Sequence, residues 1–286
     1  QWTEAVESAE VHLFQPRPAY RVRGSSAERP RAGRNPPNGA ILHFSLAEPV
    51  PDEVSLAILD AEGKEIRRLS PSVQPGWNRV VWDLRHAPAE GAREGPLGEA
   101  LPGPKVAPGT YQVRLGAGKK TAVQYLAVLK DPRLATTGDD FRAQEELALR
   151  LRDRIEEIYG SVARIRHLRE QIQSILDRGN GPLTSNGEAL LEELASIEQA
   201  LVQTKMQLPS EVIDHGPRLD LSYWDLYDVV TGADARPTDG ARERFEDLEK
   251  DLQDPLSRLR TVVEQDVPAL NELAQETGVP AVVVKR

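Results

Sequence analysis

Residues 76–84, with the sequence GWNRVVWDL, indicate how the first half of the chain folds. Val80, Trp82 and Leu84 occupy alternate positions, which is the two-residue period of a β-strand that buries one face. Large aromatic side chains are usually buried, so we expect Trp82 to lie in a core together with Tyr111. Trp77 differs, because Gly76 before it and Asn78 after it indicate the edge of a strand.

The sequence on both sides of this stretch contains further short strands. Alternating or apolar segments occur at residues 40–46, 53–59, 65–69 and 110–115, and a last one ends at Leu129. Glycine-containing turns separate them at 60–64 and 108–109. About seven short strands predict an immunoglobulin-like antiparallel β-sandwich over residues 36–132. Residues 1–35 are expected to be a linker, and the loop 86–109, with five prolines and five glycines, has no assigned role.

After Asp131 the apolar period changes to that of helices. Apolar residues from Phe141 to Ile175 recur mostly every three or four positions, which predicts one helix over 139–178. Shorter helices are expected from about 190 to 209, over 219–230, after the capping residue Thr238, and from about 266 to 278. Long helices with short links predict an antiparallel helical bundle over residues 137–286. The predicted fold class is therefore multidomain, all-β followed by all-α.

Composition excludes several classes of protein. The chain has 286 residues and no cysteine, so it can form neither disulfides nor thiolate metal sites. No apolar run approaches the roughly 18 residues that span a bilayer, so we expect no membrane span. Residues 1–132 hold 17 basic and 15 acidic side chains, whereas 133–286 hold 19 and 30. The acidic second half repels phosphate, so we expect no nucleic-acid partner.

One basic segment departs from this balance. It comprises six arginines with a single opposing glutamate: Arg17, Arg21, Arg23, Arg29, Arg31 and Arg34. The segment could be a polyanion-binding arm, but its prolines and glycines favour a solvated linker.

No catalytic motif is present. The sequence has no glycine-rich phosphate loop, no Gly-x-Ser-x-Gly and no His-Glu-x-x-His, and its five histidines are scattered. The acidic residues Asp214, Asp220, Asp225, Asp228 and Asp234 match no calcium loop, and we interpret them as a solvated helix face. We therefore expect no catalytic, cofactor-binding or metal residue. The candidate contacts with a ligand or partner are Trp77, Tyr223, Trp224 and Tyr227.

Several motifs together resemble a known family. They are HLFxPRPAYR at 12–21, NPPNGA at 35–40, LDxxGK at 59–64, NRxxWDLR at 78–85, PGTY at 108–111, DPR at 131–133 and DxPALN at 266–271. This set is similar to the region that follows the β-propeller in exported bacterial BNR/sortilin-like repeat proteins, often labelled glycosyl hydrolase-like. The resemblance implies an upstream propeller in the same polypeptide and an extracytoplasmic location. No propeller Asp-box or active-site carboxylate of the family has a counterpart here.

Three functions remain open. The sequence favours a non-catalytic accessory region that has a structural or protein-interaction role beside the propeller. The alternative is a carbohydrate-binding module of a secreted glycoside hydrolase-like enzyme, since small sandwiches often have that role. A third hypothesis is a hydrolase with an unrecognised site. Exposed aromatic rings on one sheet face would favour the second, and paired carboxylates of raised pKa would favour the third.

Overall fold

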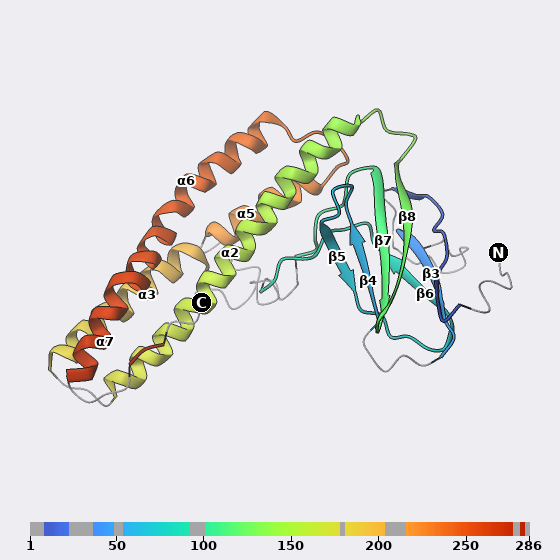
Figure 1. Ribbon diagram of the computed structural model, residues 1–286. Coiled ribbons are helices and arrows are strands. Elements are labelled where there is room, and N and C mark those ends of the chain that lie inside the picture. Colours follow the sequence, from blue (N-terminus) through green and yellow to red (C-terminus); the bar gives the residue numbers. More distant parts are fainter. Residues whose placement is uncertain are drawn as a thin grey trace, which may run out of the picture. The chain divides into compact units, whose positions relative to one another are not determined.

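The computed structural model describes residues 9–22, 37–48, 54–91, 101–177, 181–203, 216–276 and 281–283 (Figure 1). The chain divides into two compact units. Unit 1 contains both sheets and comprises Gln1–Ala87, Pro102–Glu145 and Asp234–Arg236. Unit 2 contains most of the helices and comprises Pro88–Leu101, Glu146–Ala233 and Pro237–Arg286.

The smaller sheet of unit 1 has three antiparallel strands. These are β1 (Val11–Leu13), β3 (Ala40–Leu46) and β6 (Gly76–Trp82), in the order β1-β3-β6. The edge position of β6 agrees with the edge that the sequence around Trp77 predicts. Inward side chains alternate with outward ones along β3 and β6, as the pleat of a strand requires.

The larger sheet of unit 1 has five strands and is mixed. Its order is β2-β8-β7-β4-β5, formed by β2 (Ala19–Arg21), β8 (Lys120–Lys130), β7 (Gly109–Ala117), β4 (Val54–Leu59) and β5 (Glu65–Leu69). Strand β2 pairs parallel with β8, whereas the other neighbours pair antiparallel. The parallel strand comes from the segment that the sequence indicates as a linker.

Inward side chains of both sheets share one hydrophobic core. Trp82 is fully buried there, and its indole N–H donates to the backbone oxygen of Arg85 at 2.9 Å. Its ring meets that of Tyr111 edge to face, with 5.7 Å between centroids. The prediction that Trp82 and Tyr111 are core residues is confirmed. Gly39 has φ +128°, and a Cβ there would lie 2.2 Å from the Trp82 carbonyl oxygen, so only glycine fits.

The long helix α2 (Gly138–Leu176) begins in unit 1 with a reciprocal cap. The Thr137 hydroxyl accepts from the backbone N–H of Asp140 at 3.2 Å, and the Asp140 carboxylate accepts from the Thr137 N–H at 3.0 Å. This arrangement satisfies N–H groups that have no partner within the helix. The helix start fixes the positions of Gln144 and Glu145, which contribute to the polar cluster of unit 1.

The rest of α2 and the other helices form the core of unit 2. They are α3 (Pro182–Leu201), α5 (Leu219–Thr231), α6 (Asp239–Thr261), the π-helix η3 (Val262–Asp266) and α7 (Val267–Glu276). The predicted cap of α6 is confirmed, because the Thr238 hydroxyl accepts from the Ala241 N–H at 3.2 Å. Every predicted apolar position from Leu147 to Ile175 on α2 is buried in this core.

The predicted fold class is wrong. The structure is a mixed α/β arrangement of a three-stranded and a five-stranded mixed sheet with helices. It is not an N-terminal immunoglobulin-like sandwich followed by an antiparallel helical bundle. Two findings overturn that order: β2 pairs parallel with β8, and the units interleave along the chain. Asp234–Arg236 belongs to the sheet unit, and Pro88–Leu101 belongs to the helical one.

Across the described helices, none combines the length and apolar character that crossing a bilayer would require. Residues 92–100 of the proline- and glycine-rich loop lie outside the described residues, as do the arginines at 23, 29, 31 and 34.

Candidate functional site

The four aromatic residues predicted to contact a ligand or partner lie in different environments. Trp77 is 48% exposed on β6 of unit 1. Tyr223 and Tyr227 are buried in the core of unit 2, and Trp224 is partly buried against that core. The Tyr223 hydroxyl donates to Glu249 at 2.8 Å. The structure therefore does not bring the four side chains together, and of these four Trp77 presents the most open surface.

The acidic residues of the 214–234 segment also lie apart. Asp234 belongs to unit 1 and Asp220 to unit 2, while Asp214 lies outside the described residues. Within the described ranges, no three His, Asp or Glu side chains gather closely enough to hold a metal ion.

Asp220 is not on a solvated face, contrary to our interpretation of the acidic residues. Its side chain is buried in the first turn of α5, where the Tyr159 hydroxyl donates to Oδ2 at 3.3 Å. Burial raises the pKa of Asp220 to about 6, although hydrogen bonds from Tyr159 and nearby backbone N–H groups oppose the rise. Asp220 therefore loses its proton much closer to neutral pH than an ordinary aspartate does.

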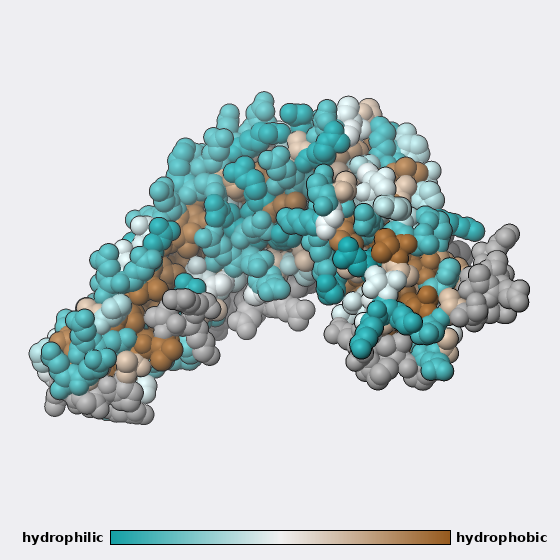
Figure 2. All heavy atoms as spheres, viewed as in Figure 1, coloured by the Kyte–Doolittle hydropathy of each residue, from teal (hydrophilic) through white to brown (hydrophobic). Residues whose placement is uncertain are grey.

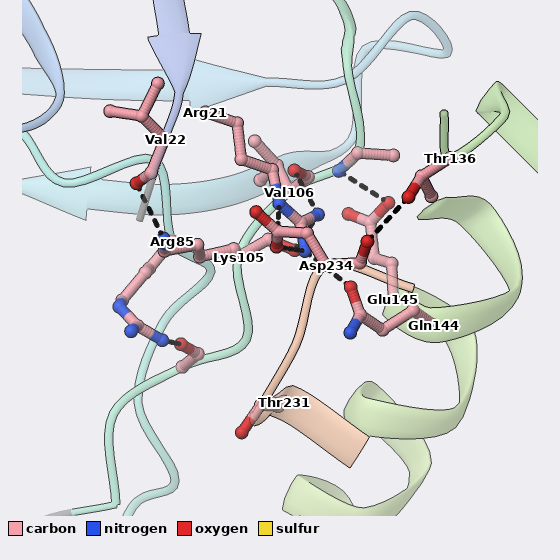
Figure 3. Close-up of polar contacts among 12 residues, drawn as sticks. Arg21, Val22, Arg85, Lys105, Val106, Thr136, Gln144, Glu145, Thr231 and Asp234 are labelled. Carbon is pink, nitrogen blue, oxygen red and sulfur yellow. Dashed lines mark hydrogen bonds and ion pairs between the residues drawn. The ribbon is translucent and has the colours of Figure 1, made fainter. Parts of the chain in front are cut away.

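The most extensive polar cluster of unit 1 surrounds Arg21 (Figure 3). The Arg21 side chain is 3% exposed, and its Nε and Nη2 donate to Asp234 at 3.1 and 2.8 Å. Nη2 also donates to Gln144 at 2.5 Å, and Nη1 donates to the backbone oxygen of Val106 at 2.9 Å. The guanidinium lies over the ring of Phe141, 4.7 Å from its centroid. For Arg21, the interpretation as part of a solvated linker is wrong.

A second polar pair joins Glu145, which follows Gln144 on α2, to His86 in the loop after β6. His86 Nε2 and Glu145 Oε1 are 2.5 Å apart, and the other oxygen of Glu145 accepts from the Ala107 N–H at 3.0 Å. Figure 3 shows Glu145 beside Gln144 and the segment that carries Asp234. Thr136 donates from its hydroxyl to the backbone oxygen of Asp234 at 2.7 Å. Both carboxylate oxygens of Glu145 are thus engaged inside the protein.

We call Arg21, Asp234, Gln144, His86 and Glu145 the Arg21 clasp. It joins four segments that are distant in sequence: strand β2, the loop before β7, the start of α2 and the segment at Asp234. The contacts satisfy buried charges and link elements, which is a structural role. The clasp cannot be detected in the sequence, because its members form no motif. One local pattern could have indicated that Arg21 is in a strand: Ala19 and Arg21 are two positions apart, as are residues on the same face of a β-strand.

The outer face of the five-stranded sheet carries exposed apolar side chains, which we call the β8 strip: Tyr20, Val123, Tyr125 and Leu129. Tyr20 on β2 pairs with Leu129 on β8, and Val123, Tyr125 and Leu129 share one face of β8. Tyr20 and Tyr125 are 50% and 58% exposed. Val123 and Leu129 are six residue steps apart on β8, a distance of about 20 Å, so the strip is as long as an ordinary strand. Figure 2 shows apolar surface over this part of unit 1, bordered by hydrophilic surface.

The comparisons with known proteins give no functional assignment. No family model and no curated protein match the chain. A solved structure described as "pT26-6p" aligns with 83% of this chain and 46% of its own length, at 12% identity and a TM-score of 0.15. This similarity carries no argument about fold or function.

Proposed function

We propose that the chain is a non-catalytic accessory region with a structural and protein-interaction role. It belongs, on this proposal, to an exported protein with an upstream β-propeller in the same polypeptide. The family resemblance of the sequence motifs supports the propeller and the extracytoplasmic location. The observation that carries the interaction role is the β8 strip.

Exposed apolar side chains that lie together distinguish contact surfaces from ordinary surface, where single apolar residues are scattered. Two of the four residues in the strip are tyrosines, which bury a large ring while keeping a hydroxyl for a rim hydrogen bond. The strip occupies β8 and the edge strand β2, whereas its neighbour β7 presents Gln112 and Arg114 on the same face. An apolar line with a polar border is the usual anatomy of a protein interface.

The Arg21 clasp supports a structural role for the same unit. It ties β2, which carries Tyr20, to the start of α2 through buried hydrogen bonds. A strand of three residues has few ladder bonds of its own, so the clasp keeps Tyr20 beside Leu129. The contact surface is thereby formed before a partner arrives, which lowers the entropic cost of binding.

The test requires the complete gene. The segment encoded upstream is expressed separately, and its affinity for this chain is measured by isothermal titration calorimetry. Val123→Thr with Tyr125→Ser should weaken binding by about thirtyfold, corresponding to about 2 kcal/mol of lost apolar burial. Both side chains are exposed, so the variant should fold normally.

The matched control is Trp77→Ala on the other sheet, which should leave this affinity unchanged. The proposal fails if no propeller is encoded upstream. It also fails if the strip variant binds as tightly as the parent chain.

A further inference from the structure

Two side-chain amides of unit 2 hold a short segment of the chain, residues 281–283, beside the second half of α2 (Figure 1). Asn271 on α7 accepts from the Val282 N–H at 2.6 Å and donates to the Val282 oxygen at 3.0 Å. Gln171 on α2 treats the next residue in the same way, accepting from the Val283 N–H at 2.7 Å and donating to its oxygen at 3.0 Å. Side chains thus bind every backbone donor and acceptor of Val282 and Val283.

This arrangement is that of a strand paired along both of its edges. In an extended chain, the N–H and C=O of one residue point to one edge, and those of the next residue point to the other. Asn271 and Gln171 meet the two edges from different helices, so each amide takes the place of a neighbouring strand. Val282 is 5% exposed and belongs to the core of unit 2, whereas Ala281 and Val283 are exposed. The site therefore recognises an extended backbone and a single side chain.

The contacts of the segment indicate which other peptides would fit. In proteins that bind extended peptides, main-chain hydrogen bonds supply affinity, and pockets for alternate side chains supply specificity. The backbone contacts made by the two amides suit any sequence in the extended conformation. The buried position of Val282 selects a β-branched apolar residue, which is also the type that prefers this conformation.

The charge near the segment favours a basic peptide. The η3–α7 stretch, residues 262–276, has no lysine or arginine and has four exposed acidic residues: Glu264, Asp266, Glu272 and Glu276. In the sequence, the segment is itself followed by Lys285 and Arg286. Complementary charge of this kind accelerates association and selects among partners.

We propose that Asn271, Gln171 and the core position of Val282 form a docking site for an extended basic peptide of a partner protein, which we call the two-amide site. Residues 281–283 occupy it in the absence of the partner. Because they belong to the same chain, their effective concentration is high, and they weaken the binding of any competing peptide. Exchange of this segment with a second copy would form the same contacts without a gain that offsets the lost freedom. The two-amide site is in unit 2 and does not depend on the β8 strip.

The test titrates a fluorescein-labelled peptide, GVPAVVVKR, with the full chain and follows fluorescence anisotropy. The peptide has the sequence of residues 278–286. Val282→Asp in the chain should release its own segment, because a carboxylate in that position would be buried without a partner. This variant should bind the peptide at least tenfold more tightly than the parent chain, which should bind it at higher concentration. Val282→Ser is a milder change that should act in the same direction, and circular dichroism shows whether each variant is folded.

The two amides are tested in the Val282→Asp chain. Adding Asn271→Ala or Gln171→Ala should weaken peptide binding at least tenfold, because each removes two hydrogen bonds. Gln173→Ala is the matched control, since Gln173 is an exposed glutamine of the same helix that donates to Asp177. It should leave the affinity unchanged.

Modified peptides test the backbone and charge contacts separately. A peptide with N-methylvaline in the position of Val282 keeps the side chain but lacks the N–H, so it should bind at least tenfold more weakly. Replacing its lysine and arginine by glutamine should weaken binding several-fold and remove most of the salt dependence.

The proposal is overturned if no folded form of the chain, parent or variant, binds the peptide. It is also overturned if Asn271→Ala binds the peptide as tightly as Gln173→Ala does, or if N-methylation has no effect. A dimer of the parent chain that Val282→Asp dissociates, detected by light scattering, would overturn it in favour of exchange between two copies.

Discussion

Replacing Arg21 by methionine should destabilise unit 1 severely, because the change removes a buried cation from its partners. The Arg21 and Asp234 side chains are 3% and 10% exposed, so neither charge is well hydrated. The substitution takes both hydrogen bonds from the Asp234 carboxylate and one each from Gln144 and Val106. Breaking one partner of a buried pair costs about 3–5 kcal/mol, and we expect a loss in that range.

A double-mutant cycle separates the ion pair from the other contacts. Asp234→Asn alone should cost less, about 1–3 kcal/mol, because the asparagine amide keeps one accepting oxygen for the guanidinium although the negative charge is lost. The double variant should cost less than the sum of the two, with a coupling of about 1–3 kcal/mol. Arg21→Lys should also lose stability, because an ammonium cannot supply the same forked set of donors.

Urea unfolding followed by tryptophan fluorescence provides the assay. Trp224 is replaced by phenylalanine in every variant, because it belongs to unit 2 and would mix the two signals. Arg114→Met is the control at an exposed arginine of the same unit, and it should change stability by less than about 0.5 kcal/mol. A loss below about 1 kcal/mol for Arg21→Met, or no coupling with Asp234, would refute the structural role of the clasp.

Three further predictions concern single residues of either unit. Trp82→Ala should cost about 3–5 kcal/mol in urea unfolding, because it empties a fully buried site; a loss under about 1 kcal/mol would contradict the core assignment. Asp220→Asn should change the free energy of unfolding of unit 2 more favourably at pH 7 than at pH 4, by about 1–3 kcal/mol. Chemical denaturation of the parent chain and the variant at both pH values measures this difference. The sign follows from the raised pKa of about 6: the stability that buried Asp220 contributes is present below pH 4 and lost as pH rises through 6. An equal effect of the substitution at both pH values would show that Asp220 does not titrate in this way. Thr238→Ala should cost about 0.5–2 kcal/mol by removing the cap of α6, whereas Thr238→Ser should cost little, and equal losses would argue against capping.

The sequence predicts elements better than it predicts their connections. The period of the apolar residues locates α2 within two residues at each end, because a helix of 39 residues repeats its pattern many times. Strands β1 and β2 were missed, since three residues contain too little alternation to be distinguished from a linker. The parallel pairing of β2 with β8 joins segments more than 100 residues apart, and no local pattern encodes it.

The same limit applies to the candidate sites. The glycine before Trp77 and the asparagine after it indicated a strand edge, and the structure places β6 at one. The clasp could not be predicted, because Arg21 and Asp234 are separated by 213 positions and each belongs to an ordinary polar segment. Tyr223 and Tyr227 show the opposite case. The sequence indicated them as candidate contacts with a ligand or partner, but the structure buries both in the core of unit 2.

Hydroxyl-radical footprinting tests the interaction role most directly, because it measures the exposure of individual side chains. It compares this chain alone with the longer polypeptide that includes the proposed upstream propeller. We predict that Tyr20 and Tyr125 are oxidised in the chain alone and protected at least several-fold in the longer polypeptide. Trp77 should be labelled equally in both, and buried Trp82 in neither. Equal oxidation of Tyr20 and Tyr125 in the two samples would contradict the interaction role of the β8 strip.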